Sequence, residues 1–118
     1  SVEDVEGDVN IKTSGGSLTL ENIIGEINAK TSGGSINLKL PNSSIQDTKV
    51  KTSGGSITAY LAEDITADVS AKTSGGRVSS EFSVDGDIKK RAIHGTINGG
   101  GAKLYLKTSG GSVRLKKI

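Results

Sequence analysis

The sequence has no cysteine, no methionine and no tryptophan, and only one of its 118 residues is proline. Without cysteine the chain forms neither disulfide bonds nor thiolate metal sites. Aromatic residues make up 3% of the chain, which excludes a core of large rings. The core must therefore consist of Val, Ile, Leu, Ala and Thr, a set suited to thin stacked layers.

Two further features are missing. No apolar run reaches the roughly 18 residues that cross a bilayer, and no charged-then-apolar leader stands at Ser1, so we expect no transmembrane segment. The net charge is only +2, from 15 basic and 13 acidic residues, so we expect no nucleic-acid partner. The length predicts a single domain, residues 1–118, which we expect to be part of a longer protein.

A short repeat dominates the chain. Lys-Thr-Ser-Gly-Gly-Ser, or a close variant, stands at residues 12–17, 30–35, 51–56, 72–77 and 107–112. The first four copies begin 18, 21 and 21 residues apart. A Gly-x-Val/Ile-Asn lead-in stands at residues 7–10 and 25–28, with a third copy at 95–98. Such self-similarity indicates a repeat architecture.

Apolar and polar residues alternate on both sides of each Gly-Gly, which predicts two short strands around one tight turn. Glycine at both turn positions allows positive φ and close approach of the next layer. Before the turn, the residues expected to face inward are Val9, Ile11, Thr13; Ile27, Ala29, Thr31; Thr48, Val50, Thr52; Val69, Ala71, Thr73; and Leu104, Leu106, Thr108. After it they are Leu18, Leu20; Ile36, Leu38; Ile57, Ala59; Val78, Ser80; and Val113, Leu115.

Two arrangements fit this pattern. The turn closes an antiparallel hairpin in a meander, or it is a corner that stacks coil upon coil in a parallel solenoid. The solenoid is favoured because it alone gives a reason to reuse Lys, Thr, Ser and Gly at one phase. We therefore predict an all-β, parallel β-solenoid (single-stranded β-helix) with about 18–21 residues per repeat. Residues 81–101 are expected to form an irregular coil with a bulge, after which the repeat resumes at Ala102.

The repeated Thr-Ser-Gly-Gly-Ser-Ile, the Gly-x-Ile-Asn lead-in and the stretch Gly-Thr-Ile-Asn-Gly-Gly-Gly-Ala-Lys-Leu before the last copy resemble a bacterial adhesin-like family. That family consists of envelope-associated β-helix domains of unknown function with TSGG repeats. The resemblance covers nearly the whole chain and implies a right-handed solenoid in an extracytoplasmic location: cell surface, periplasm or secreted. It defines no catalytic or binding residues, and Arg77 and Lys103 depart from its pattern only at the surface.

The function expected on this basis is a non-enzymatic, adhesin-like interaction or scaffold module that presents a repetitive charged face and uses no cofactor. Its partner would be an envelope polymer, a glycan or a protein. The candidate site is a lysine ladder, one outward residue per repeat, which could bind an anionic polymer or simply keep the sheet soluble. Its members are Lys12, Lys30, Lys51, Lys72 and Lys107.

Other outward and inward rows suggest alternatives. An acidic ladder of Asp8, Glu26, Asp47 and Asp68, with Lys103 at the same phase, could bind calcium between coils, although the nonapeptide of calcium-binding β-rolls is absent. The inward threonines predict stacked hydroxyls near the corner rather than an ice-binding face.

The second functional class is a polysaccharide-binding or polysaccharide-degrading β-helix, dependent on calcium in one version. Its acids would come from the loop carboxylates Glu63, Asp64, Asp85 and Asp87. Few aromatics are available to stack on sugars, because Phe82 is expected in the core, which leaves Tyr60 and Tyr105 to anchor an interface or shield a strand edge. The one histidine, His94, has no serine and acid at triad spacing.

A solenoid end left bare invites aggregation. We therefore expect either end-to-end self-association or a segment that caps the stack.

Overall fold

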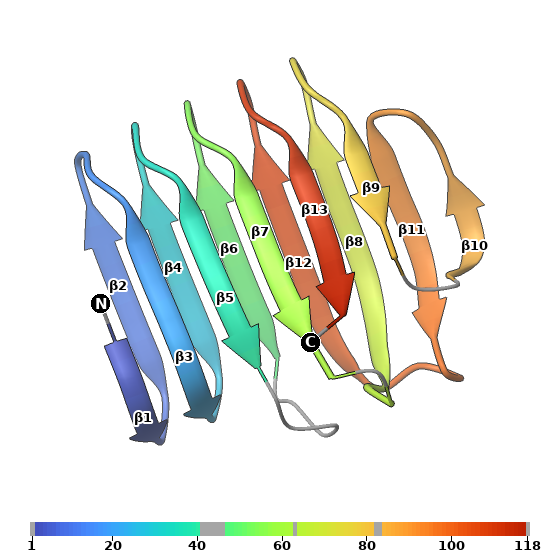
Figure 1. Cartoon of the computed structure of the whole chain (residues 1–118), viewed down its shortest axis with the longest axis horizontal. Coiled ribbons are helices and arrows are strands. Elements are labelled where there is room, and N and C mark those ends of the chain that lie inside the picture. The colour runs from blue at the N-terminus through green and yellow to red at the C-terminus, as the bar shows by residue number, and fades with distance from the viewer. Residues whose placement is uncertain (1, 41–46, 63, 82–83, 118) are drawn as a thin grey trace.

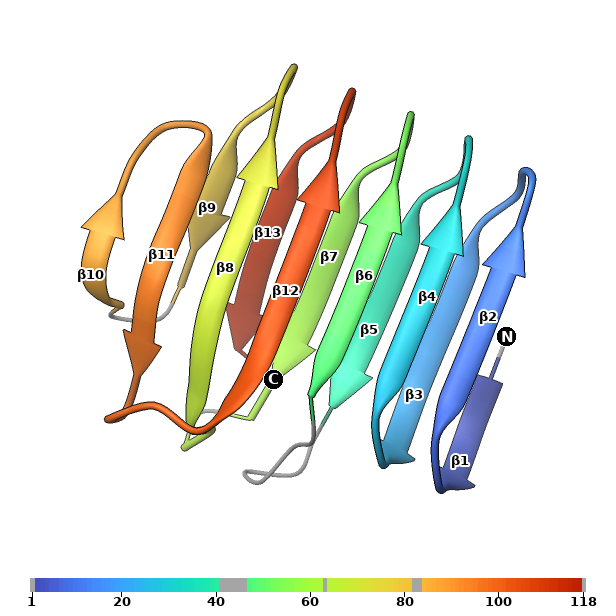
Figure 2. The same cartoon turned by 180° about the vertical axis from the view of Figure 1, so that it is seen from behind.

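The computed structural model describes residues 2–40, 47–62, 64–81 and 84–117, and every regular element in them is a β-strand. The strands form two facing sheets in a slab of 35 × 34 × 19 Å (Figures 1 and 2). In spatial order, sheet A contains β1 (Val2–Glu6), β3 (Leu18–Ile24), β5 (Ile36–Leu40), β7 (Ile57–Leu61), β13 (Val113–Lys117) and β9 (Val78–Ser80). Sheet B contains β10 (Asp85–Ile88), β11 (Ala92–Ile97), β8 (Ala67–Thr73), β12 (Ala102–Thr108), β6 (Thr48–Thr52), β4 (Ile27–Thr31) and β2 (Val9–Thr13).

Each repeat is one strand of sheet B, a Ser-Gly-Gly turn and one strand of sheet A. Equivalent strands pair in parallel and in register, as in Val9 with Ile27 and Leu18 with Ile36. The parallel solenoid is therefore confirmed and the meander is wrong. The two sheets remain open rather than closing into a barrel, and all five turns lie along one edge of the slab, here called the turn edge (Figure 1).

The core is a thin aliphatic layer between the sheets. The strand patterns alternate as expected, for example buried-exposed-buried-exposed-buried over Ile27–Thr31. Leu20, Leu38, Leu61 and Leu106 have 0–1% of their surface exposed. Ile11 and Leu18, predicted to face inward, are half-buried. Ile11 lies on β2, the end strand of sheet B, and Leu18 has a partner on one side only, because β1 begins opposite Leu20.

The predicted threonine stack is confirmed, and it explains the repeat. Thr52 Oγ1 donates to the carbonyl of Gly34 in the neighbouring coil (2.8 Å) and accepts from the N–H of Gly55 in its own turn (3.3 Å). Thr108 makes the same two bonds, to Gly55 and Gly111 (2.6 and 3.3 Å). One hydroxyl therefore closes its own turn and joins it to the next, a double role that valine could not fill.

The serine after each Gly-Gly forms a second column. The Ser56 N–H donates to Ser35 Oγ (3.4 Å), Ser112 N–H to Ser56 Oγ (3.2 Å) and Arg77 N–H to Ser112 Oγ (3.4 Å). Arg77 is the last residue of this column. No further repeat turn follows it in the stack, so a serine hydroxyl at this position would have no backbone N–H from which to accept a hydrogen bond. Its departure from serine thus follows from its place in the stack.

The order of the coils differs from the order of the chain. The last repeat, β12–β13, does not add to the end of the stack but fills a slot between earlier repeats. Strand β12 pairs with β6 on one side and β8 on the other, and β13 lies between β7 and β9 (Figure 2). Repeat spacing could not show this, because in-register pairing is the same in every slot.

Residues 81–101 interrupt the repeat, which resumes at Ala102 as expected, but the interruption is not a coil with a bulge. This segment forms an antiparallel hairpin, β10–β11, and β11 pairs antiparallel with β8 at the edge of sheet B. The Lys90 carbonyl accepts from the Val78 N–H and the Arg91 carbonyl from the Thr73 N–H (both 2.9 Å). These two carbonyls occupy the positions where a further coil would supply acceptors. The hairpin therefore caps this end of the stack, the capping alternative expected from sequence.

The third copy of the lead-in, at 95–98, also takes a different role from the first two. Gly95 and Ile97 lie in the reversed strand β11, opposite Val69 and Ala67. Asn98 is in the turn that follows, with φ 53°, and its Nδ2 donates to the Ile65 carbonyl (2.8 Å). The same sequence motif at residues 95–98 therefore ends a strand and forms a tight turn, whereas the first two copies begin a coil.

Candidate functional site

The structure brings the whole lysine ladder together on the outer face of sheet B. Register pairs Lys12 with Lys30, Lys30 with Lys51, Lys51 with Lys107 and Lys107 with Lys72. Because the strands are adjacent, the ladder presents about one ammonium per 4.8 Å along the stack. Lys51 is half-buried and the other four are exposed.

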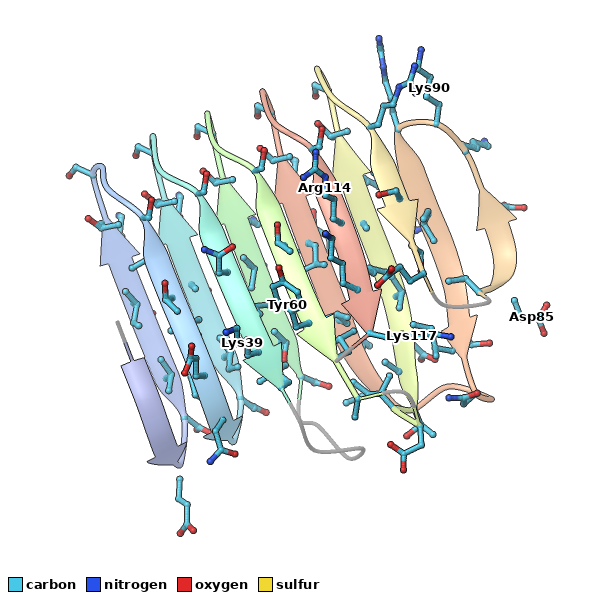
Figure 3. All side chains as sticks on the ribbon, in the orientation of Figure 1. Lys39, Tyr60, Asp85, Lys90, Arg114 and Lys117 are labelled. Carbon is cyan, nitrogen blue, oxygen red and sulfur yellow. The ribbon has the colours of Figure 1, made fainter. Side chains whose placement is uncertain are left out.

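The turn edge beside the ladder is free of acid, since no repeat block contains Asp or Glu. The hairpin cap adds Lys89, Lys90 and Arg91, all exposed, at the same edge (Figure 3). A hollow of about 150 Å³ opens here between Lys30, Lys51 and Lys107, and the remaining residues that line it are Thr31, Thr52, Ser53 and Ser109. Ammonium and hydroxyl donors surrounding a small space suit an oxyanion.

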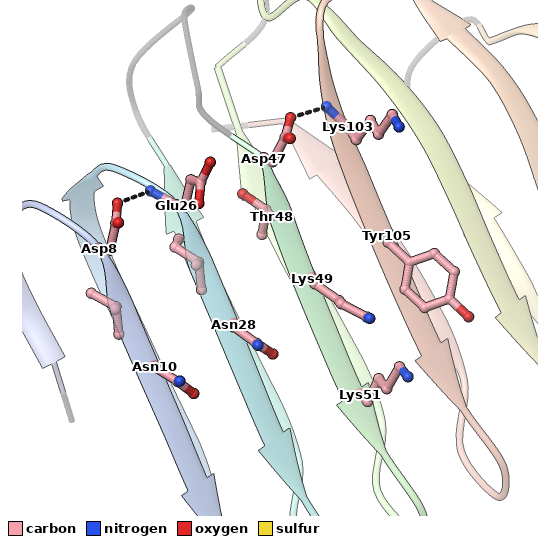
Figure 4. A pocket seen from close by; sticks show the side chains of 12 residues that line it. Asp8, Asn10, Glu26, Asn28, Asp47, Thr48, Lys49, Lys51, Lys103 and Tyr105 are labelled. Atoms are coloured by element: carbon pink, nitrogen blue, oxygen red, sulfur yellow. Dashed lines mark hydrogen bonds between the residues drawn. The ribbon is translucent and has the colours of Figure 1, made fainter.

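The acidic ladder lies at the opposite end of the strands. Asp8 Oδ1 accepts from the Glu26 N–H (3.2 Å), and Asp47 Oδ1 accepts from the Lys103 N–H (3.1 Å; Figure 4). These carboxylates therefore extend the pairing of neighbouring strands. The described residues include no group of three or more His, Cys, Asp or Glu that could hold a metal ion, so no calcium cage is built from this row.

A larger hollow, of about 640 Å³, lies over β2, β4, β6 and β12 on the outer face of sheet B. We call it the Tyr105 groove, since the half-buried ring of Tyr105 forms one wall (Figure 4). Its polar lining comprises Asp8, Asn10, Glu26, Asn28, Asp47, Lys49, Lys51, Lys103 and Tyr105. The sequence predicted that Tyr105 anchors an interface or shields a strand edge, and it did not single out Asn10, Asn28 or Lys49. These residues form a site only when strands from different repeats lie side by side.

Lys49 and Lys51 approach the Tyr105 ring from the same strand. Their Nζ atoms lie 5.9 and 5.8 Å from the ring centroid. Two cations near one ring are in cation–π range, worth about 0.5–1 kcal/mol at exposed sites. Strand β12 is internal to its sheet, so Tyr105 does not shield a strand edge.

Tyr60 occupies the equivalent situation on the opposite face. It lies on β7, also an internal strand, with Lys39 Nζ 5.8 Å from its ring centroid (Figure 3). Lys39 also pairs with Glu21 (3.5 Å between Nζ and Oε1). A third hollow, of about 240 Å³, lies over β8 and β12. The two tyrosines share their local chemistry but not their surroundings, since Tyr60 lines none of these three hollows.

The antiparallel cap creates a contact that spacing did not reveal. Ser70 Oγ lies 3.1 Å from His94 Nδ1, and Asp87 is opposite His94 in the hairpin register. The three side chains stand on an open sheet with His94 and Asp87 exposed. Ser70, His94 and Asp87 therefore form a polar row across three neighbouring strands of sheet B.

Three of the four loop carboxylates, Asp64, Asp85 and Asp87, lie within the described residues. Asp85 and Asp87 are exposed on β10, and Asp64 is exposed in the connection between β7 and β8. None of them lines the three hollows. Glu63 and Phe82 lie outside the described residues.

The fold and site define an all-β, repeat-built, solenoid-type domain with a charged outer sheet. The family model described as Toastrack DUF4097 matches residues 2–116. The chain therefore belongs to the Toastrack DUF4097 family, a bacterial domain of unknown function whose members are in general extracellular or envelope-associated. This confirms a bacterial family of domains of unknown function, but neither the adhesin assignment nor the TSGG repeat as a feature of the family. Searches of curated proteins and of solved structures gave no match. No helix in the described residues is long and apolar enough to cross a membrane.

Proposed function

We propose that this domain is a non-enzymatic, adhesin-like interaction module of the cell envelope that binds an extended anionic polymer along the lysine ladder. The observation that carries the proposal is the continuous register of five lysines across β2, β4, β6, β12 and β8. A linear array of equally spaced charges matches a linear polyanion better than a compact ligand. Rigid strands hold the array in place before binding, which reduces the entropy cost of association.

Charge separation across the molecule supports this assignment. The acidic ladder lies at the far end of the strands, and at physiological salt charges more than about 8 Å apart are largely screened from each other. The turn edge therefore acts as a local basic surface although the chain carries only +2. The partner class is an envelope polymer such as a teichoic acid, a lipopolysaccharide phosphate or a sulfated glycan, at the cell surface, in the periplasm or in the secreted space.

The test compares two triple variants that change net charge equally. Lys30→Gln, Lys51→Gln and Lys107→Gln remove the centre of the ladder, while Lys39→Gln, Arg114→Gln and Lys116→Gln remove three charges from the outer face of sheet A. Binding to immobilised teichoic acid and to heparin is measured at 50 and 300 mM salt. We expect the ladder triple to lose at least tenfold in affinity at low salt and the control triple to stay within about threefold. Equal losses in the two triples would show that binding depends on overall charge, and no binding by the parent would sink the proposal.

A further inference from the structure

We infer that the Tyr105 groove is a subsite for one acidic sugar unit of an extended glycan. Lys49 and Lys51 receive its anionic group, and Tyr105 and Asn28 receive its ring and hydroxyls. This inference rests on the proposed function only in placing the polymer on the outer face of sheet B. It adds the chemistry that such a polymer must carry.

The anion requirement follows from two ammonium groups that form no ion pair with any described residue, while the carboxylates of Asp8, Glu26 and Asp47 line the other end of the groove (Figure 4). Lys49 and Lys51 stand two residues apart on β6, so both point outward. Within the part of the chain that the structure describes, neither ammonium lies within 4.0 Å of a carboxylate. Both are close to the same ring, at 5.9 and 5.8 Å from its centroid. A carboxylate or phosphate between them would find two charge-assisted donors.

The sugar requirement follows from the rest of the lining. A half-buried tyrosine offers an apolar face together with a phenol hydroxyl, the combination that packs against a pyranose ring. Beside it, Asn10 and Asn28 are paired in register on β2 and β4 and are exposed, with one amide per strand. Each amide both donates and accepts, as a hydroxyl-rich ligand needs, whereas a simple polyphosphate would use neither amides nor ring.

The groove continues on both sides, which favours a polymer over a single sugar. Across Tyr105 a hollow of about 240 Å³ lies over β8 and β12, with Ser70, Asp68 and Lys103 in its lining. Lys51 belongs both to the Tyr105 groove and to the hollow at the turn edge. A chain lying along the stack would therefore pass Tyr105 while its other charges meet the lysine ladder.

Four probes separate the elements of the claim: oligogalacturonate, its carboxyl-reduced neutral counterpart, a sugar-substituted teichoic acid and linear polyphosphate. Each is titrated by isothermal calorimetry against the parent, Tyr105→Ala, Tyr105→Phe and Asn28→Ala. Tyr60→Ala is the matched control, since Tyr60 is also a half-buried ring beside a lysine on an internal strand. Circular dichroism and thermal melting check that each variant is folded.

We expect Tyr105→Ala to weaken binding of at least one acidic glycan on the order of tenfold, and Tyr105→Phe and Asn28→Ala to weaken it about two- to fivefold through the loss of hydrogen bonds, with Tyr60→Ala near parental affinity. Polyphosphate binding should change less than twofold. Which of the two acidic glycans responds identifies a uronate or a phosphate as the anion. Equal binding of the carboxyl-reduced counterpart and of oligogalacturonate, with the teichoic acid unaffected by Tyr105→Ala, would overturn the acidic-sugar subsite. If Tyr105→Ala changes nothing while the ladder triple still loses affinity, the subsite fails and the proposed function stands.

Discussion

At the scale of single residues, the repeat is explained by what each position must do for the coil beside it. The threonine hydroxyl bonds its own turn and the next one, as Thr73 does with Gly76 N–H (3.2 Å) and the Gly111 carbonyl (2.6 Å). The two glycines of a turn are not equivalent. A Cβ on Gly55 would collide with the Gly34 carbonyl, whereas on Gly54 it would meet no atom closer than 3.7 Å.

This difference predicts opposite outcomes for neighbouring substitutions. Gly55→Ala should lower the free energy of unfolding by about 2–4 kcal/mol, because backbone rather than a flexible side chain must move. Gly54→Ala should stay within about 1 kcal/mol of the parent, since the added methyl fits and also restricts the unfolded chain. Urea denaturation followed by circular dichroism measures both. Neither Gly54 nor Gly55 has a positive φ, so similar losses in the two variants would contradict close packing against the neighbouring turn as the reason for glycine.

At the scale of elements, sequence periodicity predicted most strands but not their neighbours. Alternation identified the inward residues of every repeat, and the common phase of Thr52 and Thr108 predicted parallel stacking. Alternation did not show that β12 lies between β6 and β8. The repeat strands have similar small inward residues, so this pattern fits any of them as a neighbour. It also did not show the reversal at β11, which depends on the positive φ of Asn98 and on the open edge of β8. The Tyr105 groove was not predictable for the same reason, as its walls come from four strands whose adjacency is tertiary.

The inserted repeat predicts an unusual response to truncation. Removing residues 102–118 deletes β12 and β13, and with them the pairing that joins β6 and β7 to β8 and β9. We expect hydrogen exchange to show lost amide protection in β8 and β11 as well as in the deleted strands. A synthetic peptide of residues 99–118 added in excess should restore it. Protection of β8 and β11 that persists in the truncated chain without peptide would show that these strands stay folded without the last repeat, which contradicts the prediction.

At the scale of the whole molecule, basic and acidic residues are concentrated at opposite ends of the strands. Nine basic residues lie at the turn edge or in its cap, and the acidic ladder lies at the opposite strand ends. Among the residues that the structure describes, no aromatic ring is fully buried. Stability thus depends on many in-register backbone pairs and thin aliphatic contacts, which are mostly distant in sequence.

Such a topology predicts that the protein folds slowly and that the pairing of β12 with its neighbours forms late. Parallel pairing requires closure of long loops before contacts form, and β12 must reach a slot bounded by strands made much earlier in the chain. We expect refolding from urea in milliseconds to seconds, with β8 amides protected in the same phase as β12 amides. Stopped-flow circular dichroism with pulsed hydrogen exchange measures this. Protection of β8 well before β12 would contradict it.

The placement of the last repeat also restricts how such a domain can change in length. In an ordinary repeat array, a duplicated unit can be appended at the end of the chain and find an exposed neighbour on which to stack. Here both neighbours of β13 are already taken, and the far end is closed by the reversed hairpin. Among the described strands, a coil stacked beside β1 and β2 would meet strands that carry no hairpin cap. A coil appended directly after β13 would instead have to displace β7 or β9, so in this fold the order of the repeats along the chain does not set the direction in which the stack can lengthen.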